Sequence, residues 1–298
     1  MSLEPPDRLA LGRGDLQLDL LPRLGGAVAA YRRATPGGTQ ALFRESTADA
    51  DDVLQTACFP LVPYCNRIRD GRFRFGDREV RLTPNLPPQK HPLHGQGWRN
   101  PWTVTGAGPD WAELVYRHEP DEWPWAYEAS QRFTLDHAGL EIQLGCRNLA
   151  SEPMPCGLGL HPFFDAPAGT MLDTRVAGVW TVDEEIMPVR LEPPVGRYAL
   201  ENRSIAGASL DNGYEGWSGK AILRWPGAAA GLRISSADAA RFQVYAPAGQ
   251  PVLCAEPVTN ANDALRRPEA AWAEAGIVVL GPGEVASMTA RFDPMVGA

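Results

Sequence analysis

Residues 127–135 read YEASQRFTL and alternate between apolar and polar side chains, with Gln131 as the one polar residue on the apolar face. Residues 140–146 (LEIQLGC) and 286–292 (ASMTARF) repeat the alternation. A period of two is typical of an antiparallel strand that buries one face and leaves the other wet or facing a cleft. These stretches predict three strands around which the fold is arranged.

Further apolar runs predict strands at 15–20, 26–32, 71–75, 79–83, 102–106, 112–117, 220–225, 231–235, 241–246, 252–256 and 276–280. The 28 prolines and 30 glycines are spread evenly, which suits short strands joined by tight turns. Only residues 262–274 predict a short helix, with Asn262 as its N-cap. The sequence therefore predicts an all-β fold, a large antiparallel β-sandwich, in a single domain spanning residues 1–298.

Composition and charge exclude several classes of function. The 28 Lys and Arg against 36 Asp and Glu give a net charge of −8, whereas a nucleic-acid-binding protein needs a basic face. No basic N-terminal stretch leads into an apolar segment, and no apolar run reaches 18 residues, so we expect a cytoplasmic protein with no membrane partner. The five cysteines are scattered and odd in number, which predicts free thiols in the core.

Two polar residues interrupt apolar runs with groups able to move protons. His161 lies in GLHPFF, where Pro162 favours extended backbone, and its pKa near neutrality suits a proton donor. Glu256 follows the apolar run VLCA, where partial burial would raise its pKa. Taken singly, each has a plainer interpretation: a core histidine bonded to the backbone, and a surface glutamate at a strand end.

Other polar residues sit where apolar sequence ends. His94 closes the segment HPLH, in which Pro92 and the following Gly95 argue against a helical metal pair, so we expect no metal site. His94 would instead face a cleft or stabilise a turn. Asn66 and Arg67 follow the apolar run 59–64 and are suited to hold hydroxyl groups.

Five segments, taken in order, resemble the aldose 1-epimerase (galactose mutarotase) family. They are 66–68 (NRI), 91–95 (HPLHG), 159–164 (GLHPFF), 210–211 (LD) and 254–257 (CAEP). The resemblance spans about residues 15–292 and implies a β-sandwich with an open cleft, no cofactor and a small-molecule sugar as partner. Residues 257–260 (PVTN) depart from the family pattern, which leaves the preferred sugar open.

The resemblance also implies roles for individual residues. Glu256 corresponds to the general base, His161 to the general acid and His94 to a second imidazole beside the ring oxygen. The implied ligands of sugar hydroxyls are Asn66, Arg67, Asp211 and Gln243. For Asp211, the local sequence Asp-Asn-Gly equally suits a simple turn.

These roles imply interconversion of the α and β anomers of a free aldose by ring opening and closure, in a monomer or homodimer. One alternative is a hexose-6-phosphate epimerase whose cationic pocket uses Arg72, Arg99 or Arg132. A non-catalytic carbohydrate-binding protein is another, and a glycoside hydrolase is disfavoured because only one carboxylate is well placed.

The same roles predict a geometry. His161 and Glu256 should face each other about 5–8 Å apart, by analogy with the paired groups that flank a sugar in glycosidases. Phe163 and Trp98 should wall the cleft.

Overall fold

A computed structural model describes residues 8–296, whose regular structure is β apart from short 3-10 turns. The larger sheet contains, in spatial order, β1 (Leu9–Arg13), β2 (Leu16–Leu21), β3 (Ala27–Thr35), β5 (Cys58–Leu61), β13 (Gly159–Asp165), β22 (Val252–Val258), β21 (Arg241–Ala246), β18 (Leu210–Glu215), β15 (Gly178–Val182) and β16 (Pro188–Glu192), with β4 (Gly38–Ala41) paired to β3.

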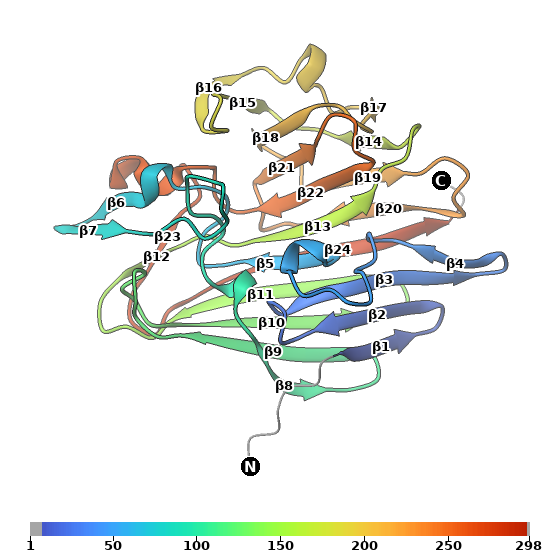
Figure 1. Cartoon of the computed structure of the whole chain (residues 1–298), viewed down its shortest axis with the longest axis horizontal. Helices are drawn as coiled ribbons and strands as arrows, with labels where there is room; N and C mark the ends of the chain where they lie inside the picture. Colours follow the sequence, from blue (N-terminus) through green and yellow to red (C-terminus); the bar gives the residue numbers. More distant parts are fainter. Residues whose placement is uncertain (1–7, 297–298) are drawn as a thin grey trace.

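The second sheet contains, in spatial order, β17 (Arg203–Ser204), β14 (Met171–Thr174), β19 (Lys220–Arg224), β20 (Ala230–Ser235), β24 (Val285–Val296), β11 (Leu140–Asn148), β10 (Tyr127–Leu135), β9 (Trp111–His118) and β8 (Thr103–Ala107). Two further sheets of two strands each pair β6 (Arg72–Phe75) with β7 (Arg78–Arg81), and β12 (Met154–Cys156) with β23 (Val278–Leu280). All of these strand pairings are antiparallel. The expected antiparallel β-sandwich is thereby confirmed (Figure 1).

The alternating stretch 127–135 forms β10, and its register with β11 explains the one polar exception. Tyr127 pairs with Asn148 and Leu135 with Leu140, so the alternate apolar side chains all reach the core. Gln131 is buried among them, and its Nε2 donates a hydrogen bond to the Gly26 carbonyl at 2.9 Å. A buried amide is tolerated because its hydrogen bond is made inside the protein.

Every strand predicted from sequence overlaps an observed strand, but several strands of the larger sheet were not predicted. β5 (CFPL) and β13 (GLHPFFD) are apolar on both faces and contain proline, so they lack the alternation on which the prediction rests. Both faces are covered. Leu160 and Phe164 pack into the core between the sheets, while Phe59 and Phe163 belong to a second apolar cluster on the opposite face.

The helix predicted at 262–274 is wrong. Two 3-10 turns, η5 (Ala264–Arg266) and η6 (Glu269–Ala271), lie on either side of Pro268, which lacks the N–H that a continuous helix would need. Asn262 caps neither turn. The remaining 3-10 turns are η1 (Val53–Gln55), η2 (Arg69–Gly71), η3 (Gly97–Arg99) and η4 (Gly196–Tyr198).

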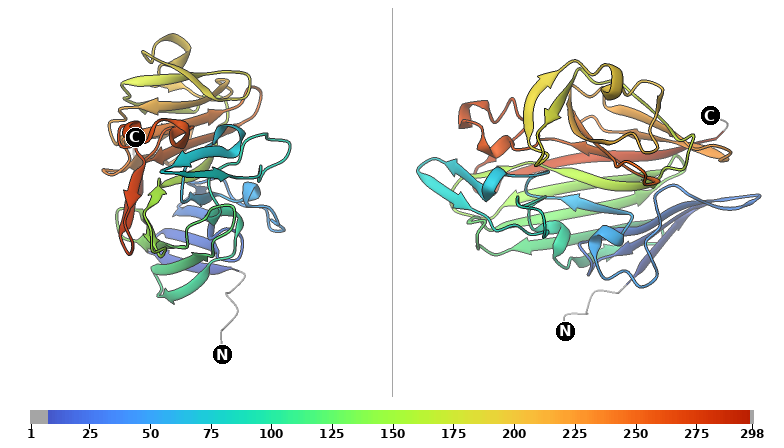
Figure 2. Two further views of the ribbon diagram at one scale, coloured as in Figure 1. Left: turned by 90° about the vertical axis from the view of Figure 1, so that its left-hand side faces the viewer. Right: turned by 45° about the horizontal axis from the view of Figure 1, so that its top comes forward.

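The segments between β5 and β8 lie on the face of the larger sheet that is turned away from β24 (Figures 1 and 2). They bring loop residues over the centre of that sheet. All five cysteines are free and buried, as expected from the sequence. Among residues 8–296 no helix has the length and apolar character needed to cross a membrane.

Candidate active site

Four neighbouring strands in the middle of the larger sheet present polar side chains on the same face. Leu253 and Ala255 of β22 point into the core, so Glu256 points to the opposite face. The same alternation places His161 of β13, Gln243 of β21 and Asp211 of β18 on that face, where all four line a cleft. Asp211 therefore lies within a strand, and the alternative interpretation of a simple turn is wrong.

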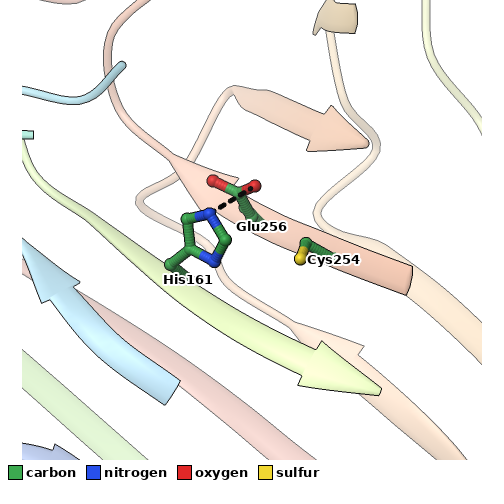
Figure 3. A group of neighbouring side chains, drawn as sticks. All are labelled: His161, Cys254 and Glu256. Carbon is green, nitrogen blue, oxygen red and sulfur yellow. Dashed lines mark ion pairs between the residues drawn. The ribbon is translucent and has the colours of Figure 1, made fainter. Parts of the chain in front are cut away.

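The strand register brings His161 and Glu256 together. Gly159 pairs with Val258 and Phe163 with Cys254, which places His161 directly opposite Glu256. Their side chains point toward each other in Figure 3, with 3.4 Å between His161 Nε2 and Glu256 Oε1. Only 12% of the His161 side chain and 3% of the Glu256 side chain are exposed.

This separation is shorter than the expected 5–8 Å, so that part of the prediction is wrong. The expectation borrowed the spacing of glycosidases, whose two carboxyl groups act from either side of the ring. The anomeric hydroxyl oxygen and the ring oxygen of an aldose are bonded to the same carbon. Groups that act on both must therefore lie close together.

Burial acts on the two groups in opposite directions. It raises the pKa of Glu256 well above its ordinary value, and the nearby Asp211 carboxylate adds to the effect while Arg67 opposes it. Burial lowers the pKa of His161 to about 3, and the Arg44 and Arg67 charges act in the same direction. Both shifts favour the neutral forms, so burial favours an uncharged pair whose single proton lies on the Glu256 carboxyl.

His94 is held in a fixed tautomer by the loop that carries Asn66. Its backbone N–H donates to the Asn66 carbonyl at 3.0 Å, and its Nδ1 accepts from the Asn66 N–H at 3.1 Å. Because Nδ1 is an acceptor, the proton of the neutral ring lies on Nε2. Burial, His161 and Arg67 lower the pKa of His94 well below its ordinary value, so it remains a neutral donor at the cleft.

The four expected hydroxyl ligands form one hydrogen-bonded network. Asn66 Oδ1 accepts from Arg67 Nη1 at 3.1 Å, and Arg67 Nη2 lies 3.5 Å from Asp211 Oδ2. Gln243 Nε2 donates to Asp211 Oδ1 at 2.8 Å. Burial raises the pKa of Asp211, while Arg67 and Gln243 oppose this. The network fixes donors and acceptors along one wall of the cleft.

Aromatic side chains form the apolar part of the cleft. Phe163 and Trp98 both line it, as the sequence suggested. Phe59, which was not predicted, stacks between His161 at 4.5 Å and Trp98 at 5.3 Å between ring centroids. The cleft has a volume of about 380 Å³, within the range of small-molecule sites.

The family relationship follows from comparison with known proteins. The sequence model of the aldose 1-epimerase family matches residues 8–293. This chain belongs to the aldose 1-epimerase family. Uncharacterized protein YphB of Escherichia coli (strain K12) is 29% identical over 284 residues, covering 92% of this chain and 94% of that protein.

Solved structures agree with the family assignment. A crystal structure from Escherichia coli K12, of a protein provisionally assigned as an aldose 1-epimerase, has a TM-score of 0.87 at 26% identity and covers 97% of this chain and 99% of that one. A galactose mutarotase-like protein from Clostridium acetobutylicum has a TM-score of 0.85 at 18% identity, covering 97% and 95% of the two chains. The second likeness shows the shared fold alone.

In this member of the aldose 1-epimerase family, side chains of a neighbouring loop hold the segment that carries the cleft residues. Asn260 Oδ1 accepts from the Cys65 N–H, and Asn262 Oδ1 accepts from the Arg67 N–H, each at 3.0 Å. Asp263 Oδ1 accepts from the Arg69 N–H at 2.8 Å. These positioning roles were missed because the pairs are almost two hundred residues apart in the chain.

One group among residues 8–296 combines enough ligand types to hold a metal ion. His161, Cys254 and Glu256 bring their nitrogen, sulfur and oxygen atoms within 4.8 Å of one another (Figure 3). Metal binding by cysteine requires a thiolate. Burial, with Glu256 adding to it, raises the pKa of Cys254 well above its ordinary value, so the thiol stays protonated. The absence of a metal site stays a prediction.

The arginines considered for a phosphate pocket do not line this cleft. Arg72 is in β6, and Arg99 packs over Trp98, 4.8 Å from its ring centroid, beside a separate groove. Arg132 belongs to the second sheet and pairs with Glu113. The alternative of a phosphorylated sugar therefore loses the three residues on which it was based.

Proposed function

We propose that this protein interconverts the α and β anomers of a free aldose. The observation that carries the proposal is the contact between His161 and Glu256 in a cleft walled by hydroxyl-binding groups. A pyranose lying over this contact would place its anomeric hydroxyl at Glu256 and its ring oxygen at His161. The neutral Nε2–H of His94 would donate a further hydrogen bond beside the ring oxygen.

The reaction returns both groups to their starting state. Glu256 takes the proton of the anomeric hydroxyl while His161 gives a proton to the ring oxygen, and the C1–O bond of the ring breaks to give the aldehyde. Rotation about C1–C2 turns the other carbonyl face toward the C5 hydroxyl. Glu256 then returns its proton to the carbonyl oxygen, and His161 takes the proton of the attacking hydroxyl.

The proton positions fit this cycle. The arrangement favoured by burial, a protonated Glu256 beside a neutral His161, is the one required for ring closure. Ring opening starts from the closed sugar and requires this proton on His161 instead. The 3.4 Å contact between His161 Nε2 and Glu256 Oε1 is the path by which the proton passes from Glu256 to His161 before the ring opens. Each positioned acid or base contributes about 10²–10⁴-fold to the rate.

Polarimetry tests the proposal. With protein and EDTA present, the optical rotation of freshly dissolved α-D-glucose, α-D-galactose and a panel of other aldoses should relax faster than in matched buffer for at least one sugar. Folded protein that accelerates none of them, with or without EDTA, would refute the proposal. Activity that is seen only without EDTA would instead point to a metal at His161, Cys254 and Glu256.

The pH profile should be broader than that of an unperturbed glutamate–histidine pair. The active pair holds one proton. Activity therefore falls at low pH, where a second proton binds to the pair at His161, whose pKa is about 3. It falls at high pH as Glu256 loses its proton, above the ordinary value of 4.5. An unperturbed glutamate–histidine pair would hold a single proton between pH 4.5 and pH 6.5, the ordinary pKa values of the two groups. We expect kcat/KM, corrected for buffer catalysis, to remain high below pH 4.5 and above pH 6.5 as well. A maximum confined to that window contradicts the expectation.

Arg67→Ala should mainly raise KM. Arg67 contacts Asn66 and Asp211 rather than Glu256, so its loss removes hydroxyl binding present in both the ground state and the transition state. A charged hydrogen bond of about 1.5–3 kcal/mol corresponds to roughly a 10–100-fold increase. Initial-rate polarimetry separates the two constants. A fall in kcat with unchanged KM would assign Arg67 to the chemical step.

A further inference from the structure

Arg44 is a second arginine that lines the cleft. Its guanidinium lies 4.0 Å from the centroid of the Phe163 ring, and that ring is 4.7 Å from the ring of His161. The backbone N–H of Arg44 also donates to the Phe163 carbonyl at 2.8 Å. The order along the cleft is therefore Glu256, His161, Phe163 and Arg44.

The Arg44 side chain is fixed in place but keeps donors unused. Its Nη2 donates to the Leu54 and Thr56 carbonyls, each at 2.8 Å. In the part of the chain that the structure describes, Arg44 makes no side-chain hydrogen bond through Nε or Nη1 and no ion pair. Asp165 forms no ion pair with Arg44, although its charge opposes the lowering of the Arg44 pKa by burial.

Among the described residues that line the cleft, Arg44 is a cation without a carboxylate partner. Asp211 forms an ion pair with Arg67, and Glu256 contacts His161 at 3.4 Å, so both carboxylates of the cleft have a partner of their own. Arg44 adds one positive charge without a partner, although burial already lowers its pKa. Holding a partly buried cation without a counter-ion is costly, so a fixed cation in a cleft points to an anionic ligand.

We propose that Arg44 binds a singly charged acidic group, a carboxylate or sulfonate, on the carbon outside the sugar ring. In a pyranose the anomeric oxygen, C1, the ring oxygen, C5 and the outer carbon follow one another in that order. This matches the order Glu256, His161, Phe163, Arg44 and places the outer carbon near Phe163. The assignment of an acidic aldose as substrate rests on the proposed epimerase function.

A single charge on the ligand fits the site better than phosphate. A phosphate ester carries about −1.5 to −2 at neutral pH, and one unpaired arginine would leave part of that charge unbalanced. A carboxylate or sulfonate carries one charge and accepts from the Nε and Nη1 donors. Tyr245 and Gln250 also line the cleft and can add hydrogen bonds.

The test compares mutarotation of D-glucose, D-glucuronate, 6-deoxy-6-sulfo-D-glucose and D-glucose 6-phosphate by the wild type and by variants. We expect kcat/KM for one of the two singly charged sugars to exceed that for glucose by about 10–100-fold. Arg44→Gln should remove most of this preference, Arg44→Lys should keep part of it, and the surface control Arg132→Gln should leave it unchanged. Thermal unfolding of each variant shows whether it is folded.

The outcomes separate this inference from the proposed function. Equal or faster turnover of glucose, a preference for the phosphate ester, or a preference that survives Arg44→Gln would overturn the acidic-sugar assignment while leaving the epimerase intact. If no sugar is turned over, the proposed function fails, and calorimetry with methyl glucuronide tests the site alone. Binding to the wild type but not to Arg44→Gln would support the site, and no binding would overturn it.

Discussion

Glu256→Gln is expected to lower kcat for mutarotation by about 10²-fold or more. Glutamine keeps the size of the side chain and can still donate or accept a hydrogen bond, but it cannot take a proton from the anomeric hydroxyl. Its neutral amide resembles the neutral carboxyl form that burial favours by raising the pKa of Glu256. The variant should therefore fold, and KM should change less than kcat.

A matched control separates the role of Glu256 from a general effect of losing a carboxylate. Glu141→Gln removes a carboxylate from β11 of the second sheet, where it pairs with Arg291 at 3.1 Å and does not line the cleft. Its kcat should equal that of the wild type. Near-wild-type kcat in Glu256→Gln, measured with the same sugar, would require another base to be assigned.

The sequence predicted best those strands whose two faces differ. β10 was predicted with its observed limits because one face lies in the core and the other is partly exposed. β5 and β13 lie in the centre of the larger sheet, with the core on one face and the apolar lining of the cleft on the other. Their sequences are therefore apolar throughout, and the alternation that marks a strand is lost.

The residues of the candidate site also differ in how clearly the sequence reveals them. His161 and Glu256 stand out because a proton-transferring group in an apolar run is unusual, and their strands meet in the sheet. The residues that hold the Arg67 loop do not stand out. Asn262 was interpreted as a helix cap, a role compatible with its local sequence, but it bonds the Arg67 backbone across the fold. Arg44 was missed because only the folded cleft shows that its charge has no partner.

Replacing His161 should have an effect as large as replacing Glu256. His161→Gln removes the group that carries a proton to and from the ring oxygen, so kcat should fall by about 10²-fold or more. The matched control is His137→Gln, because His137 is exposed on the turn between β10 and β11, outside the cleft. Its kcat should not change.

The double variant shows whether the two residues act as a unit. In each half of the proposed cycle one of the two residues takes a proton while the other gives one, so the loss of either residue interrupts every turnover. The kcat of the double variant should then lie close to that of the slower single variant, as found for other groups that act together. Two losses that multiply would mean that the two proton transfers are independent of each other, although the 3.4 Å contact places His161 Nε2 beside Glu256 Oε1.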